Sequence, residues 1–98
     1  MATIGTFTRT ANGYAGRIRA LTFETDAEFR PNRKDHEKAP DFRIFAPFGE
    51  IGAAWHRTSA AEREYLSVKL DDPAFPAPIY ASLSLSDDDE TWLLIWSR

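Results

Sequence analysis

Residues 80–86 read YASLSLS, and this stretch decides the class of fold. Its side chains alternate between apolar and polar after Tyr80, with Ala81, Leu83 and Leu85 in one phase and Ser82, Ser84 and Ser86 in the other. Successive side chains of a β-strand point to opposite faces of the sheet, so the alternation predicts a strand with one buried face and one solvated face. The serines are then the polar face of a sheet rather than a set of nucleophiles.

The same period of two recurs along the chain and predicts strands in FRIF, IGAAW and LSVKL, at residues 42–45, 51–55 and 66–70. In IGAAW we expect Ile51, Ala53 and Trp55 to share one face. WLLIW, at residues 92–96, is apolar in both phases. This predicts a strand covered on both faces, either by the same domain or by a second copy of the chain in a homodimer.

The start of the chain predicts a β-hairpin. IGTFTRT and YAGRIRALTF flank a short Ala-Asn-Gly connection, and Asn12-Gly13 is the pair favoured where a tight turn needs positive φ at both central positions. Gly5 and Gly16 lie inside the two strands, where glycine indicates a bulge or the close approach of another backbone.

Three polar segments predict connections. A short strand around Phe29 is followed by PNRKDHEKAPD, residues 31–41, the most loop-like stretch of the chain. In SAAERE, Ser59 and Glu62 have the spacing of a helix capping box, which predicts either one helical turn or a polar hairpin end. SDDDE, residues 86–90, predicts a solvated turn because four like charges would repel one another in a core.

DDPAFPAPIY, residues 71–80, raises the question of a catalytic carboxylate pair. Asp71 and Asp72 are adjacent, so on a strand their carboxylates would point to opposite faces and would not converge on one atom. The three prolines of this stretch cannot donate backbone hydrogen bonds, which excludes a central strand. We therefore predict a stiff corner held to the core by Phe75, and an enzyme using Asp71 or Asp72 is the less favoured alternative.

The length of 98 residues predicts a single all-β domain over residues 1–98. We expect a small antiparallel barrel or sandwich of about seven short strands, with at most one helical turn. There is no cysteine, which excludes disulfides and thiolate chemistry. His36 and His56 lack the spacing of a zinc site, so we expect no metal, no cofactor and no catalytic residues. No signal-like leader or long apolar run is present, which predicts a cytoplasmic protein without a membrane partner.

Charge is distributed unevenly within the net charge of −3. Residues 1–57 carry nine Lys and Arg against seven Asp and Glu, which is +2, whereas residues 58–98 carry three against eight, which is −5. The total argues against a strong non-specific nucleic-acid binder.

The best functional candidate in the sequence is a surface of basic and aromatic side chains. Its members are Arg9, Arg17, Arg19, Arg43 and Phe45 on predicted strands, and Arg33 and Lys34 in the 31–41 loop. Cations that follow phosphates beside rings that stack on bases are typical of single-strand binders. We therefore predict a non-catalytic binding module whose partner is a protein or a single-stranded nucleic acid. Exposed arginines are, however, also ordinary on sheet faces, where edge charge prevents aggregation.

Several stretches resemble a bacterial family known as domain of unknown function 736. They are APDFRIFA, IGAAW, YLSVKLDDPAFPAPIYA and LIWSR, together with the opening IGTFT and GYAGRIRALTF. The resemblance covers nearly the whole chain and implies no established activity and no catalytic residues. It implies proximity to plasmid or conjugative-transfer genes, hence nucleic-acid or transfer-apparatus partners. The chain departs from the family pattern at residues 59–64, where a glycine-containing turn is expected.

Overall fold

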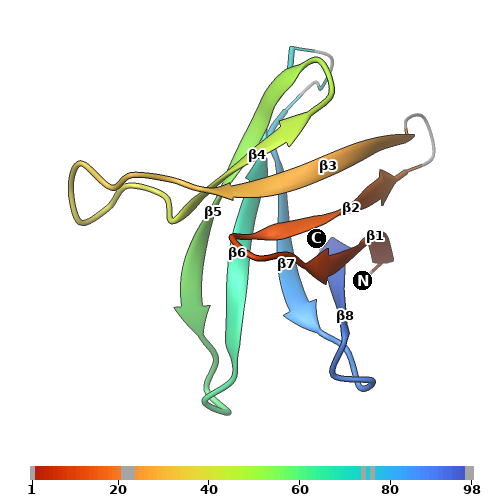
Figure 1. The fold of residues 1–98 in the computed structure, drawn as a ribbon, viewed down its shortest axis with the longest axis vertical. Coiled ribbons are helices and arrows are strands. Elements are labelled where there is room, and N and C mark those ends of the chain that lie inside the picture. Colours follow the sequence, from red (N-terminus) through yellow and green to blue (C-terminus); the bar gives the residue numbers. More distant parts are fainter. Residues whose placement is uncertain (1, 21–23, 74, 76, 97–98) are drawn as a thin grey trace.

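The computed structural model describes residues 2–20, 24–73, 75 and 77–96, which form strands joined by turns and loops (Figure 1). The strands are β1 (Ala2–Arg9), β2 (Tyr14–Arg19), β3 (Glu24–Pro31), β4 (Phe42–Ala46), β5 (Gly49–Thr58), β6 (Glu64–Leu70), β7 (Ile79–Leu85) and β8 (Thr91–Trp96). A helix able to cross a membrane is absent from this part of the chain.

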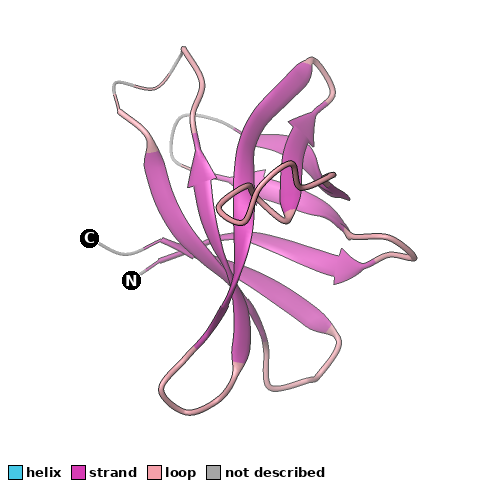
Figure 2. Cartoon of the chain, turned by 90° about the vertical axis from the view of Figure 1, so that its left-hand side faces the viewer, coloured by secondary structure: helices cyan, strands magenta, loops and turns pink. Residues whose placement is uncertain are grey.

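The strands form a closed barrel in chain order, and every neighbouring pair is antiparallel. Pairing of β1 with β8 closes the sheet on itself, so each of the eight strands pairs with a neighbour on both sides. The all-β prediction is confirmed, with eight strands instead of about seven. Of the two predicted architectures, barrel and sandwich, the structure is the barrel. In an up-and-down barrel the connections alternate between the two ends, which places residues 10–13, 32–41, 59–63 and 86–90 at one end. The 59–63 and 86–90 loops are the two at the bottom of Figure 2.

Alternate residues of the strands fill the interior with a layered apolar core. Phe7 and Phe29 are buried in edge-to-face contact, with ring centroids 5.1 Å apart, and Tyr14 contacts Phe29 at 5.8 Å. The predicted phase of YASLSLS is confirmed at Leu83, which is 0% exposed. Full burial of one such side chain contributes about 1.5–3 kcal/mol, so the interior is a packed core and not a channel.

The first hairpin is confirmed, but its turn differs from the prediction. The backbone N–H of Thr10 donates to the Gly13 carbonyl at 2.8 Å, so the central residues are Ala11 and Asn12 rather than Asn12 and Gly13, and neither pair has positive φ. Glycine at position 13 has another reason, since a Cβ there would overlap the carbonyl oxygen of Phe29. Gly13 is therefore required by a close backbone approach and not by the positive φ that we predicted.

Close backbone approach also explains the glycines inside the strands, as predicted. A Cβ on Gly16 would overlap the carbonyl oxygen of Thr6 on the neighbouring strand. Gly5 lies at the irregularity where the register between β1 and β8 shifts after Thr3.

The prediction that Ile51, Ala53 and Trp55 share a face is wrong. Ile44 pairs with Gly52 and Phe45 pairs with Glu50, so Ile51 is an extra residue in β5. This bulge shifts the side-chain phase by one residue, because the period of a strand is two. Both Ile51 and Ala54 are consequently buried, and Ala54 is 0% exposed.

Residues 59–63 form the polar hairpin end and not a helical turn. The Ser59 N–H donates to the Arg63 carbonyl, the Glu62 N–H donates to the Ser59 carbonyl, both at 2.9 Å, and Glu62 has φ of 60°. A three-residue loop of this type places its last residue in the left-handed region, where glycine is usual. Glu62 therefore adopts the left-handed conformation within the turn for which the family resemblance implies a glycine.

The proline-rich stretch is a corner between β6 and β7, at the other end of the barrel. The Asp71 N–H donates to the Ile51 carbonyl at 2.8 Å, and the Phe75 N–H donates to the Asp72 carbonyl at 2.9 Å. Phe75 is partly buried against the core, as predicted, while Ala74 and Pro76 lie outside the described residues. No group of three His, Asp or Glu side chains able to hold a metal occurs in the described part of the chain.

Candidate functional site

The outer face of β2, β3 and β4 carries three of the arginines that the sequence singled out, Arg17, Arg19 and Arg43, and each of them has a carboxylate beside it. Arg17 pairs with Glu24 at 2.7 Å and with Asp26 at 2.6 Å, and Arg19 lies 3.9 Å from Glu24. The hydrogen bond to Glu24, and then the one to Asp26, raises the pKa of Arg17 above its ordinary value. The same Arg17–Glu24 contact lowers the pKa of Glu24.

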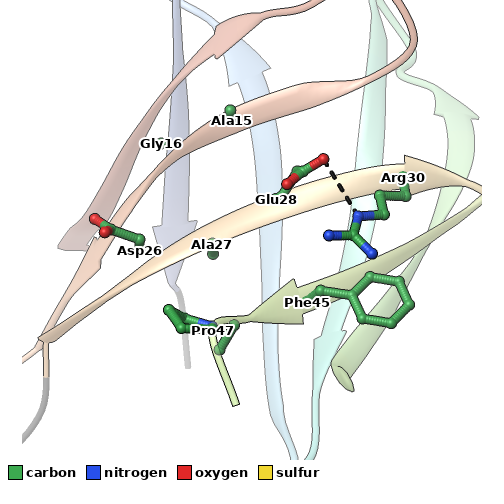
Figure 3. Close-up of a pocket in the computed structure, with 9 residues that line it drawn as sticks. Ala15, Gly16, Asp26, Ala27, Glu28, Arg30, Phe45 and Pro47 are labelled. Atoms are coloured by element: carbon green, nitrogen blue, oxygen red, sulfur yellow. Dashed lines mark hydrogen bonds and ion pairs between the residues drawn. The ribbon is translucent and has the colours of Figure 1, made fainter. Parts of the chain in front are cut away.

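The same pairing continues on β3 and β4. Arg43 pairs with Glu50 at 2.9 Å, and Arg30 pairs with Glu28 at 3.2 Å while its guanidinium lies 4.6 Å from the centroid of the Phe45 ring. Figure 3 shows Glu28, Arg30 and Phe45 at the side of a pocket of about 340 Å³ on this face. Because each arginine has a carboxylate beside it, the face presents little net positive charge to a phosphate.

The remaining predicted site residues lie elsewhere, so the structure does not gather the seven into one surface. Lys34 pairs with Asp41 at 3.2 Å, and Arg33 is exposed in the same loop. Burial raises the pKa of Asp41, but hydrogen bonds from the His56 N–H and Lys34 outweigh it and hold the pKa below its ordinary value. Asp41 therefore fastens the 32–41 loop to β5.

Arg9 belongs to the inward phase of β1, at the end of the barrel that carries the 59–63 and 86–90 loops. It pairs in register with Tyr14, donates from Nη1 to the Tyr14 hydroxyl at 3.3 Å, and places its guanidinium 5.2 Å from that ring centroid. Arg9 thus lies at the mouth of the barrel interior and not beside Arg17 and Arg19.

A cleft that sequence reasoning missed lies at this same end, between the β5–β6 hairpin and the β7–β8 hairpin. The β6–β7 ladder stops at the pair Leu66 and Leu83. Both strands nevertheless continue, because Glu64 still pairs with Thr58 on β5 and Leu85 still pairs with Trp92 on β8. The two hairpin tips diverge below that point in Figure 1.

The diverging hairpins enclose a cleft of about 620 Å³. Its lining residues are Ser59, Arg63, Glu64, Tyr65, Ser84, Leu85, Ser86, Asp89 and Trp92. A volume of this size lies within the range of about 300–1,000 Å³ that is usual for ligand sites.

Backbone groups on both walls point into the cleft. Ser59 and Arg63 form a hydrogen-bonded pair, as do Ser86 and Thr91. Hydrogen-bonded and non-hydrogen-bonded pairs alternate along an antiparallel ladder. The N–H and C=O of Glu64 and of Leu85 therefore point away from their hairpin partners and towards the gap.

The floor of the cleft is apolar and aromatic. Leu85 is 38% exposed, although it continues the buried phase of Leu83. Trp92 packs edge-to-face on Tyr14 with ring centroids 5.1 Å apart, and Tyr14 contacts Phe42 at 5.6 Å. Burial raises the pKa of Tyr14 above its ordinary value, the positive charge of Arg9 opposes this, and Glu64 adds to it.

The rim of the cleft is acidic. The segments 59–64 and 86–90 together carry six carboxylates and one guanidinium. Asp88 holds the second segment in shape, because its carboxylate accepts hydrogen bonds from the Ser86 hydroxyl at 2.6 Å, from the Thr91 and Glu90 amides, and from the Thr91 hydroxyl. These bonds, that of Ser86 first, hold the pKa of Asp88 well below its usual range. Six of the eight carboxylates of residues 58–98 thus belong to the two segments that form the rim of the cleft.

These features define a small up-and-down β-barrel with a filled interior and one acidic cleft in its wall. The chain belongs to the family described as Protein of unknown function (DUF736), whose family model matches residues 3–98. This confirms the resemblance noted in the sequence. Comparisons with curated proteins and with solved structures found no significant match.

Proposed function

We propose that the chain is a non-catalytic binding module that holds a segment of a partner protein in the cleft between the β5–β6 and β7–β8 hairpins. The observation that carries the proposal is the early end of the β6–β7 ladder at Leu66 and Leu83. It leaves directed backbone groups beside the half-exposed Leu85 and the Trp92 ring. Apolar contact area with a few oriented polar groups is the usual composition of a binding site.

Charge favours a protein partner over a nucleic acid. The rim carries six carboxylates against one guanidinium and would repel a phosphate backbone. The arginines on the outer face of β2 to β4 are already paired with carboxylates. A protein of a DNA-transfer system is the kind of partner that the family resemblance implies.

The position of Asp71 and Asp72 favours binding over catalysis. Both lie in the β6–β7 connection, at the end of the barrel opposite the cleft. Backbone hydrogen bonds at both residues close the corner. This is the structural role that the prolines of this stretch predict.

Selection of a displayed library of random peptides on the immobilised protein tests the proposal. We expect enriched peptides whose binding is lost in Leu85→Arg and kept in Phe48→Arg. Phe48 is a matched control because it is 73% exposed and lies in the β4–β5 connection at the other end of the barrel. Circular dichroism of both variants confirms that they fold. Failure to enrich any peptide, or equal binding to the Leu85→Arg protein, contradicts the proposal.

A homodimer is a second candidate, favoured by the outward side of β8. Leu93 and Ile95 point outward and are partly exposed. Their direct cross-strand neighbours are uncharged: Thr6 and Ser84 lie beside Leu93, and Thr3 and Ser82 lie beside Ile95. Such a surface can pair with its own copy without charge repulsion. Sedimentation over a range of concentrations tests it: a monomer throughout rejects the dimer, and Leu93→Lys should dissociate one that forms.

A further inference from the structure

We infer that the occupant of the cleft is an extended, cationic peptide segment that adds a β-strand between β6 and β7. This inference rests on the proposed function and names the class of ligand and its mode of binding.

The backbone of the cleft walls supports a strand rather than a helix. Glu64 and Leu85 would form the next hydrogen-bonded pair if the β6–β7 ladder continued beyond Leu66 and Leu83. Because the strands diverge instead, each residue offers one N–H and one C=O to the gap. An extended peptide supplies matching groups at every second residue, whereas a helix uses its backbone groups internally.

The side chains of the walls fix which face of the added strand is apolar. Leu85 and Trp92 are paired and belong to the inward phase, and Tyr14 lies beneath Trp92. Every second side chain of an added strand would point to this floor. We therefore expect apolar residues at two alternate positions of the ligand, with polar residues between them.

The rim determines the charge of the ligand. Asp87, Asp89 and Glu90 on one tip and Glu62 on the other are exposed, and Arg63 is the one basic residue of these two segments. Lysine or arginine at the ends of the bound segment would meet these carboxylates. Opposite charge of this kind chiefly raises the rate of association and selects the partner.

The test uses the peptides enriched from the displayed library, resynthesised and titrated into ¹⁵N-labelled full-length protein. We expect the amide signals of Glu64 and Leu85 and the indole signal of Trp92 to shift. We expect the enriched sequences to carry excess lysine and arginine and alternating apolar residues. Because a strand between β6 and β7 uses alternate backbone N–H groups on its two sides, methylating the backbone nitrogens of either alternate set of peptide residues should weaken binding.

Charge is tested separately with the variant Asp87→Lys/Glu90→Lys, which keeps the turn-forming Asp88. At low salt it should weaken binding about tenfold, and the difference should shrink as salt rises. The control is Asp35→Lys, an exposed acid in the 32–41 loop, which should leave affinity unchanged.

The outcomes separate this inference from the proposed function. Shifts at Leu85 and Trp92 with no effect of either methylation set, or with neutral or acidic enriched peptides, overturn the strand inference and leave a binding cleft. Enriched peptides that shift signals only outside the cleft overturn both.

Discussion

Two leucines on β7 give a direct comparison of core and cleft by truncation to alanine. Leu83 and Leu85 lie two residues apart in the same phase, but Leu83 is 0% exposed and Leu85 is 38% exposed. Leu→Ala removes three carbons, worth about 2.4 kcal/mol when fully buried at ~0.8 kcal/mol each. At Leu83 a cavity adds to this loss and brings the cost to about 3–4 kcal/mol.

At Leu85 the cost should be much smaller. Scaling the loss by the buried fraction gives about 1.5 kcal/mol, and no closed cavity forms because the site opens to solvent. Urea denaturation followed by tryptophan fluorescence measures both changes in the free energy of unfolding. The two variants should differ by about 2 kcal/mol, or roughly 10 °C in Tm. Equal costs for Leu83→Ala and Leu85→Ala would mean that Leu85 is enclosed in solution, which refutes an open cleft.

Three further predictions test the turns and the barrel mouth. Burial raises the pKa of Tyr14, so above about pH 10 the folded chain keeps a proton that the unfolded chain loses, and the free energy of unfolding should fall as the pH rises. In an absorbance titration the Tyr14 phenol should ionise at a raised pH, and this step should be absent in Tyr14→Phe. The lowered pKa of Asp88 contributes stability above about pH 4 that is lost on further acidification, so the Tm difference between wild type and Asp88→Ala should be full at neutral pH and shrink in strong acid. Glu62 has φ of 60°, so thermal melts should show Glu62→Gly unchanged or stabilised by up to ~1 kcal/mol and Glu62→Val destabilised; a destabilised glycine variant would contradict the strained turn.

The strands were predictable from sequence because the inner face of the barrel wall is apolar, so every second residue of a strand is apolar. Leu83 and Val68, both buried, follow this alternation. The failures have local physical causes. The bulge at Ile51 follows from the pairing of β5 with β4, which IGAAW alone does not encode. The Asn-Gly pair predicts a turn with positive φ, whereas Gly13 is required by the nearby Phe29 carbonyl.

The candidate site was less predictable, because it depends on where two strands stop pairing. Nothing in YASLSLS distinguishes the buried Leu83 from the half-exposed Leu85. The pairing of the arginines could have been anticipated, since Arg17 lies opposite Asp26 once β2 and β3 are in register. The acidic rim could also have been anticipated, because residues 59–63 and 86–90 must lie at the same end of an up-and-down barrel.

The central claim is that the β6–β7 ladder ends at Leu66 and Leu83 and leaves a binding edge beyond it. Amide hydrogen exchange of the free protein, followed residue by residue by NMR, tests this most directly. We predict slow exchange at Leu66 and Leu83, which bond each other across the ladder, and fast exchange at Glu64 and Leu85. Protection of Leu85 equal to that of Leu83 would show that the hairpins pair to their tips and that there is no cleft between them.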